Sequence, residues 1–124
     1  MDVKTAILHG VPEEAIFMRY PQRIEEETCV KLVKLLYGLN QSPRCWYKHL
    51  AKVFNALGFE VNDADPCLFV KWEGKQPIIV FVHVDDMIIG GNSASVLKFK
   101  HDIQKYFKME DLSEIVYVLG IKVT

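Results

Sequence analysis

Two adjacent aspartates, Asp85 and Asp86, interrupt an otherwise apolar and largely β-branched run from residue 78 to residue 89. Burying a carboxylate without a partner is costly, so the chain must turn toward solvent here or provide cations for the pair. The run therefore predicts two strands joined by a tight turn that carries both carboxylates. Two interpretations stay open, an ordinary acidic turn and a turn that presents its oxygens to a hard divalent cation such as Mg²⁺.

Other segments rich in β-branched and aromatic residues lie on both sides of this turn. Those at residues 67–72 and 76–84 are separated by Glu73-Gly74-Lys75, which predicts a hairpin. Further strands are predicted at residues 16–19, 29–35, 87–89 and 117–123, and residues 1–6 resemble the end of a strand.

A first helix is predicted to begin at Ser42, whose hydroxyl can cap the free amides, and to end at Gly58. Its apolar residues recur at steps of four, three and four and should pack on a sheet: Trp46, Leu50, Val53 and Leu57. Its other side carries three basic residues at four-residue intervals, here called the basic row: Arg44, Lys48 and Lys52. The basic row is compatible with a solvated face and with a surface for phosphates.

A second helix is predicted from Ser93 or Ser95 to about Lys108. Four of its residues are expected to point inward: Leu97, Ile103, Tyr106 and Phe107. Strands and helices in this irregular order predict an α+β fold, a mostly antiparallel sheet with two helices packed on one face.

Composition limits the class of protein. The 124 residues are 50% hydrophobic and 25% charged, which is typical of one compact domain. No apolar run approaches the length of a membrane span and no signal-like segment is present, so we expect a soluble, intracellular domain without membrane partners. A net charge of -1 argues against a nucleic-acid binder.

The cysteines contain no C-x-x-C pair, and Cys45 with His49 lacks the second pair that a zinc site needs.

A two-metal phosphoryl-transfer site would need a third carboxylate from another element. Asp2 is the candidate, although it lies 83 residues before Asp85 in the sequence. Spacing alone leaves open that Asp2 is ordinary solvated surface.

Five ordered sequence blocks carry a family resemblance. They are MDVKTAILHG at residues 1–10, LYGLNQSPRCWY at 36–47, DPCLF at 65–69, VDD at 84–86 and LGI at 119–121. In order and spacing, these blocks resemble the reverse transcriptase of copia-type LTR retrotransposons, over essentially the whole chain.

The resemblance implies a ferredoxin-like polymerase palm that acts as an RNA-directed DNA polymerase. Two ions, Mg²⁺ or Mn²⁺, would be held by Asp2, Asp85, Asp86 and the backbone carbonyl of Val3. The implied partners are deoxynucleoside triphosphates and an RNA or DNA template with its primer.

The same resemblance assigns the other site residues. Ile7 and Gln41 would lie beside the nucleotide, the basic row would contact the template, and His83, Leu119 and Gly120 would contact the primer. This sequence has Ile7 where the family usually has an aromatic residue that closes against the sugar, and His83 where it usually has tyrosine.

Residues 1–124 are therefore predicted to form a partial reverse transcriptase domain, a fragment or decayed copy without most of the fingers and without the thumb and ribonuclease H regions. Within a retrotransposon particle it would be cytoplasmic. One alternative is a catalytically inactive remnant that acts, if at all, as a nucleic-acid or protein binding module. A third interpretation, independent of the family, is a small metal-binding α+β domain that uses His83, Asp85 and Asp86.

Overall fold

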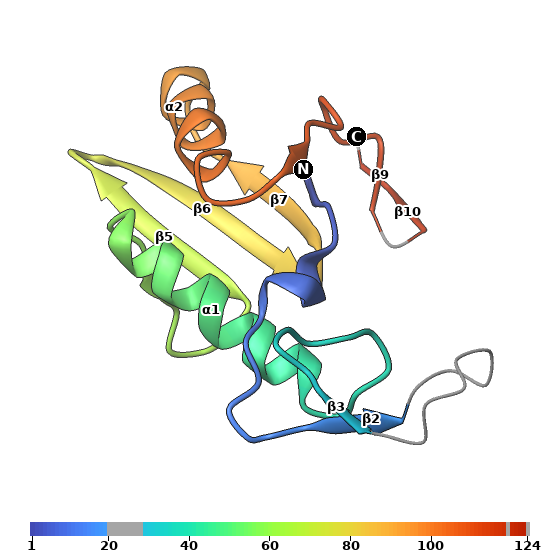
Figure 1. The fold of residues 1–124 in the computed structure, drawn as a ribbon. Helices are drawn as coiled ribbons and strands as arrows, with labels where there is room; N and C mark the ends of the chain where they lie inside the picture. The colour runs from blue at the N-terminus through green and yellow to red at the C-terminus, as the bar shows by residue number, and fades with distance from the viewer. Residues whose placement is uncertain (20–28, 119, 124) are drawn as a thin grey trace. The chain divides into compact units, whose positions relative to one another are not determined.

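The computed structural model describes residues 1–19, 29–118 and 120–123, and the chain divides into two compact units (Figure 1). Unit 1 contains Met1–Lys4 and Ala51–Thr124, and unit 2 contains Thr5–Leu50. The candidate metal ligands Asp2, Asp85 and Asp86 all belong to unit 1.

Unit 1 is built on a six-stranded antiparallel sheet. Its strands, in spatial order, are β4 (Glu60–Val61), β5 (Leu68–Glu73), β6 (Gln76–His83), β7 (Asp86–Gly90), β1 (Asp2–Val3) and β8 (Met109–Glu110). Glu73 pairs with Gln76, so the predicted hairpin across Gly74 is confirmed. The predicted strand at residues 1–6 is reduced to the two residues of β1, which lie between β7 and β8.

Alternation along β6 gives the sheet two different faces. Ile78, Val80 and Val82 are buried, whereas Ile79 and Phe81 point to the other face and keep part of their surface exposed. The strand period of two thus assigns one face of the sheet to the core of unit 1.

Helices α1 (Ser42–Ala56) and α2 (Ser93–Ile103) meet on the buried face. The ring of Phe54 in α1 lies 4.4 Å from that of Phe69 in β5 and 5.7 Å from that of Phe99 in α2, measured between centroids. The predicted α+β fold, with a mostly antiparallel sheet and two helices on one face, is confirmed.

Helix α1 begins at the predicted residue and ends within two residues of the predicted glycine. Gly58 has φ of +84°, the Gly58 N–H donates to the Asn55 carbonyl, and the Phe59 N–H donates to the Phe54 carbonyl. This is a Schellman termination, which a glycine favours because it accepts a left-handed backbone. The predicted capping role of Ser42 is wrong, because Ser42 is the first residue of the helix rather than the cap before it, and its buried hydroxyl donates to the Leu36 carbonyl at 2.7 Å.

The prediction for α2 is wrong in its length and in part of its buried face. The helix begins at Ser93, capped by the Asn92 side chain that accepts from the Ser95 N–H, but it ends at Ile103 rather than near residue 108. Leu97 is 67% exposed, because it lies two residues from the buried Phe99 and therefore on the opposite side of the helix. Tyr106 follows the helix and is 50% exposed, while the predicted burial of Ile103 and Phe107 is confirmed.

The end of the chain is a hairpin rather than the predicted single strand at residues 117–123. Strand β9 (Tyr117–Val118) pairs antiparallel with β10 (Ile121–Lys122). Gly120, between them, has φ of +80° and permits the reversal.

Unit 2 contains a 3-10 helix (Ala6–His9) and a second small hairpin of β2 (Phe17–Arg19) and β3 (Cys29–Lys31). The predicted strand at residues 29–35 therefore ends at Lys31. Leu35 is fully buried against Gly10, where an added Cβ would lie 2.5 Å from the Leu35 Cδ1. The ring of Trp46 lies 6.1 Å from that of His9.

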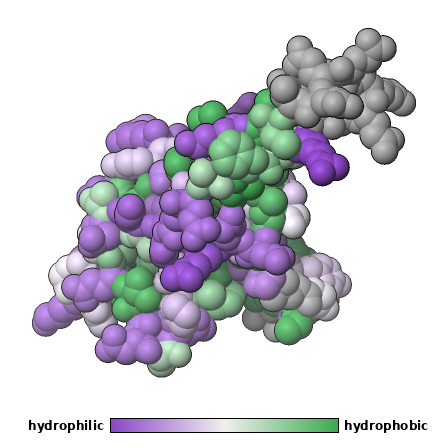
Figure 2. Space-filling view, turned by 60° about the horizontal axis from the view of Figure 1, so that its bottom comes forward, coloured by the Kyte–Doolittle hydropathy of each residue, from purple (hydrophilic) through white to green (hydrophobic). Residues whose placement is uncertain are grey.

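None of the helices in the described residues is both long and apolar enough to cross a membrane. On the face drawn in Figure 2, hydrophobic areas are interspersed with hydrophilic ones.

Candidate active site

The two adjacent aspartates lie at the tip of the β6–β7 hairpin. His83 pairs with Asp86 across the hairpin, so Val84 and Asp85 form its two-residue loop. Val84 has φ of 57°, an uncommon value for a β-branched residue, and its side chain is 49% exposed. The hairpin thereby brings two consecutive carboxylates, Asp85 in the loop and Asp86 at the start of β7, to one end of the six-stranded sheet, as the sequence predicted.

Asp2 lies directly beside this pair because β1 is inserted next to β7. Asp2 is the register partner of Asp86, and the Val3 N–H donates to the Asp85 carbonyl at 2.9 Å. The backbones of Met1 and Met87 exchange hydrogen bonds of 2.9 and 2.7 Å, which hold the two strands together. The structure therefore places the three residues that the resemblance groups at neighbouring backbone positions, and their roles stay predictions.

A third strand adds an acidic residue that the sequence did not single out. Asp2 is also the register partner of Glu110 in β8. Directly opposed residues of an antiparallel sheet share a face, so Asp86, Asp2 and Glu110 form one line across three strands, here called the acidic row. No signal in the sequence marks Glu110, because only the pairing of β1 with β8 places it in this row.

The acidic row affects the ionisation of its central member. The pKa of Asp2 is raised above the usual value, first because the carboxyl group is partly desolvated. The negative charges of Asp85, Asp86 and Glu110 raise it further. Lys4 opposes them, and its ammonium group lies 3.0 Å from a carboxylate oxygen of Glu110. The row is thus a site of unfavourable like-charge contacts that a cation would relieve.

The donor chemistry of these residues fits a hard divalent cation, because carboxylate oxygens are the ligands that Mg²⁺ prefers. Across residues 1–19, 29–118 and 120–123, however, no three His, Cys, Asp or Glu side chains are gathered closely enough to hold a metal ion. The residues present therefore match such an ion in the chemical type of their donor atoms and in their register across β1 and β7. Val3, whose carbonyl the resemblance assigns to metal, is buried in β1.

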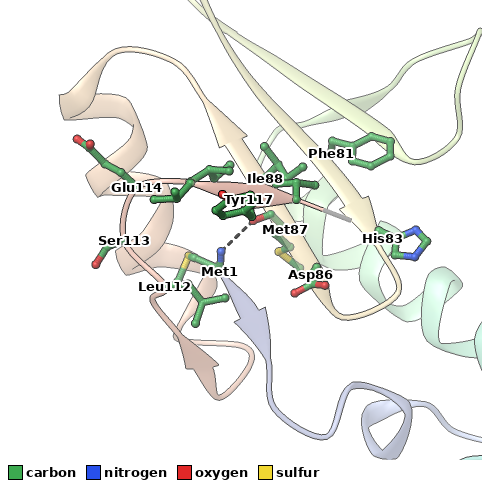
Figure 3. Close-up of a pocket in the computed structure, with 13 residues that line it drawn as sticks. Met1, Phe81, His83, Asp86, Met87, Ile88, Leu112, Ser113, Glu114 and Tyr117 are labelled. Atoms are coloured by element: carbon green, nitrogen blue, oxygen red, sulfur yellow. Dashed lines mark hydrogen bonds between the residues drawn. The ribbon is translucent and has the colours of Figure 1, made fainter. Parts of the chain in front are cut away.

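A pocket of about 310 Å³ opens beside the hairpin (Figure 3). His83 and Asp86 lie at the hairpin end of this pocket, and Phe81 and Ile88 continue its wall along β6 and β7. The opposite wall is formed by residues 112–118, which include Tyr117 and Val118 of β9. The exposed His83 therefore shares a pocket with Asp86 and with the strand that leads to Gly120.

Leu119, predicted to contact the primer, lies outside the described residues. Gly120 lies between β9 and β10 and is exposed.

The remaining predicted site residues lie on unit 2 and on α1. Ile7 is buried in the 3-10 helix, and Gln41 is half-buried, with its carbonyl accepting from the Cys45 N–H at the start of α1. All three residues of the basic row are exposed on α1. Lys48 forms an ion pair with Glu13, so part of the positive charge of the basic row is compensated.

Comparison with known proteins gives a consistent result. A family model described as reverse transcriptase (RNA-dependent DNA polymerase) matches residues 1–124. The Retrovirus-related Pol polyprotein from transposon TNT 1-94 of Nicotiana tabacum is 38% identical over 129 residues, which cover 99% of this chain and 10% of that protein.

Two polyproteins of Arabidopsis thaliana are also similar. The Retrovirus-related Pol polyprotein from transposon RE1 is 35% identical, and that from transposon RE2 is 32% identical. Each match covers 98% of this chain and 9% of the relative. The chain thus spans about a tenth of the length of these three relatives, and no solved structure matches it.

Proposed function

Because this chain belongs to the reverse transcriptase (RNA-dependent DNA polymerase) family, we propose that residues 1–124 form the palm part of a copia-type enzyme that extends DNA on a template. The single observation that carries the proposal is the register of Asp2 with Asp86, which puts a carboxylate from β1 beside the β6–β7 hairpin. A two-metal transfer needs carboxylates from two elements, and this arrangement provides them.

In the proposed reaction, the primer 3′ hydroxyl attacks the α-phosphorus of a deoxynucleoside triphosphate, and the bond to pyrophosphate breaks. Asp2, Asp85 and Asp86, with the Val3 carbonyl, would hold two Mg²⁺ or Mn²⁺ ions. When bound, these ions supply positive charge that activates the hydroxyl and stabilises the leaving group. The pairing of β1 with β7 and of β7 with β6 keeps Asp2 and Asp86 in register on neighbouring strands, with Asp85 in the adjoining loop.

Other residues bind the substrates in this proposal. Ile7 and Gln41 lie beside the incoming nucleotide, and the basic row contacts template phosphates, for which exposed lysine and arginine side chains are suited. His83, Leu119 and Gly120 contact the primer in this proposal, and the pocket shared by His83, Asp86 and Tyr117 supports the assignment of His83.

A second candidate is a nucleic-acid or protein binding module without catalysis. It is favoured by the exposed basic row and by the lack of a preassembled group of three metal-ligating side chains in the part of the chain that the structure describes. This candidate predicts binding of a primer and template with no chain extension.

Primer extension tests both candidates. The 124-residue chain is incubated with a DNA primer on an RNA template, Mg²⁺ or Mn²⁺ and deoxynucleoside triphosphates. Extension that is lost in Asp85→Asn and Asp2→Asn, but kept in the exposed-surface control Asp63→Asn, supports the polymerase. Binding of the primer and template without extension favours the binding module, and extension that survives Asp85→Asn contradicts the proposed site.

A further inference from the structure

Glu110 is the one member of the acidic row that the proposed metal ligand set does not use. Its backbone opposes that of Asp2 in neighbouring strands, and its side chain is 53% exposed. The Glu110 carboxylate lies 3.0 Å from the ammonium nitrogen of Lys4. Glu110 therefore contacts a cation that is also placed to affect Asp2.

Lys4 follows β1 and lies on the same side of the chain as Asp2. The residues are two positions apart, and the Lys4 N–H donates to the Lys108 carbonyl at 2.9 Å, which continues the pairing of β1 with β8. Side chains two positions apart along an extended strand project from one face. An ammonium group in this position can approach Asp2 or Glu110, and in the structure it is paired with Glu110.

We infer that Glu110 is a positioning residue that holds the Lys4 ammonium away from the Asp2 carboxylate, so that Asp2 stays available to a divalent cation. An ammonium group paired with Asp2 would neutralise the carboxylate that the divalent cation needs. The ion pair of Lys4 with Glu110 prevents this competition. The inference rests on the proposed function, because Asp2 is a metal ligand only within that proposal.

The test is a double-variant cycle on Mn²⁺ affinity, measured by electron paramagnetic resonance of the 124-residue chain without nucleotide at low ionic strength. Glu110→Gln is expected to weaken Mn²⁺ binding by about fivefold, the upper range for an exposed ion pair. In a Lys4→Gln background, the same substitution is expected to change the affinity by less than about twofold, because no lysine remains to be released.

The double-variant cycle distinguishes a positioning role of Glu110 toward Lys4 from a direct attraction between the Glu110 charge and Mn²⁺. If Glu110 attracted Mn²⁺ only by its own charge, Glu110→Gln would weaken binding equally in both backgrounds, and that result, like no effect at all, would overturn the inference. Glu60→Gln removes a charge from an exposed glutamate in β4, at the other edge of the sheet, and should leave the affinity unchanged. Thermal unfolding of each variant verifies that the sheet remains folded.

Failure of the proposed function gives a different result. If Asp2→Asn does not reduce Mn²⁺ binding, or if the unsubstituted chain binds no Mn²⁺, the proposed metal site is wrong and the inference about Glu110 is wrong with it. If Asp2→Asn abolishes binding and the cycle shows equal effects, only the inference about Glu110 is wrong.

Discussion

Val84 has an unusual backbone conformation at the tip of the β6–β7 hairpin. Its φ of 57° lies in the left-handed region, where the Cβ of an L-residue crowds the following carbonyl. A two-residue hairpin loop favours such angles because they match the twist of the strands. The loop that carries Asp85 therefore stores strain that its neighbours β6 and β7 maintain.

Replacing Val84 should release part of this strain. We expect Val84→Asn to raise the free energy of unfolding by about 1 kcal/mol, because asparagine tolerates the left-handed region. Urea unfolding at neutral pH measures the change. Val33→Asn is the matched control, since Val33 is also exposed but has no left-handed backbone, and an equal gain in both variants would contradict the explanation.

Asp2 makes stability depend on pH. Its pKa is raised above the ordinary 3.8, so the folded chain holds this proton more tightly than the unfolded chain. The contribution of Asp2 to stability is therefore present below pH 3.8 and is lost as pH rises through its raised pKa.

Asp2→Asn should remove the loss of stability that Asp2 causes as the pH rises. At pH 7 we expect the variant to be more stable than the unsubstituted chain by about 0.5 kcal/mol, the scale of a like-charge pair across strands, and the difference should vanish toward pH 3. Urea unfolding across this pH range tests the prediction. A variant less stable at pH 7 would show that the carboxylate makes a net favourable contact instead.

Among the elements, the two helices show how far sequence periodicity reaches. The apolar residues predicted to form the buried side of α1 were largely assigned correctly. Three of the four are buried: Trp46, Leu50 and Val53. The buried side of α2 is instead Ser95, Phe99 and Ile103, at steps of four. Apolar residues on both sides of this helix made its rotation ambiguous, and the ring of Phe99 against Phe54 and Phe59 resolves it.

The rotation of α2 predicts opposite results for two nearby substitutions. Phe99→Ala should reduce the free energy of unfolding by about 3 kcal/mol, because it leaves a cavity among the aromatic rings. Leu97→Ala should change it by less than about 0.5 kcal/mol, since that side chain is largely exposed. Chemical unfolding of the two variants side by side tests the assignment, and a larger loss from Leu97→Ala would reverse it.

The length of α2 was less predictable than its start. The helix stops at Ile103, Phe107 is buried, and the Lys108 carbonyl already accepts from the Lys4 N–H. Pairing of β8 with β1 thus draws the chain out of the helix. A helical pattern in the sequence contains no information about a strand partner more than 100 residues away.

At the scale of the whole molecule, the predicted resemblance to copia-type reverse transcriptases is confirmed by the family match and by the transposon Pol polyproteins.

The described residues also leave the second face of the sheet partly open. Trp72 is 66% and Ile79 is 39% exposed on that face, and Val70 pairs with Ile79 beside them. An exposed apolar face of this kind promotes self-association.

Reducing the apolar character of this face should make the isolated chain more soluble. We expect the double variant Trp72→Thr/Ile79→Thr to shift sedimentation velocity profiles toward the monomer, while the free energy of unfolding changes by about 0.5 kcal/mol or less. Val11→Thr, on an exposed residue of unit 2, is the control and should leave the profile unchanged. A monodisperse, cooperatively unfolding monomer before any substitution would contradict the prediction.

The sequence by itself determined several of the local elements and the family. The turn at Asp85 and Asp86, the hairpin across Gly74 and the first helix from Ser42 follow from alternation, turn residues and periodicity, which act between near neighbours. The resemblance supplied the grouping of Asp2 with the two aspartates.

Only the tertiary structure decided which strands lie beside β1. That pairing put Asp2 between Asp86 and Glu110, raised the pKa of Asp2 and brought Lys4 to Glu110. The reason is physical, because strand pairing is selected by the packing of the whole sheet and its helices. A two-residue strand has too little pattern of its own to specify its partners.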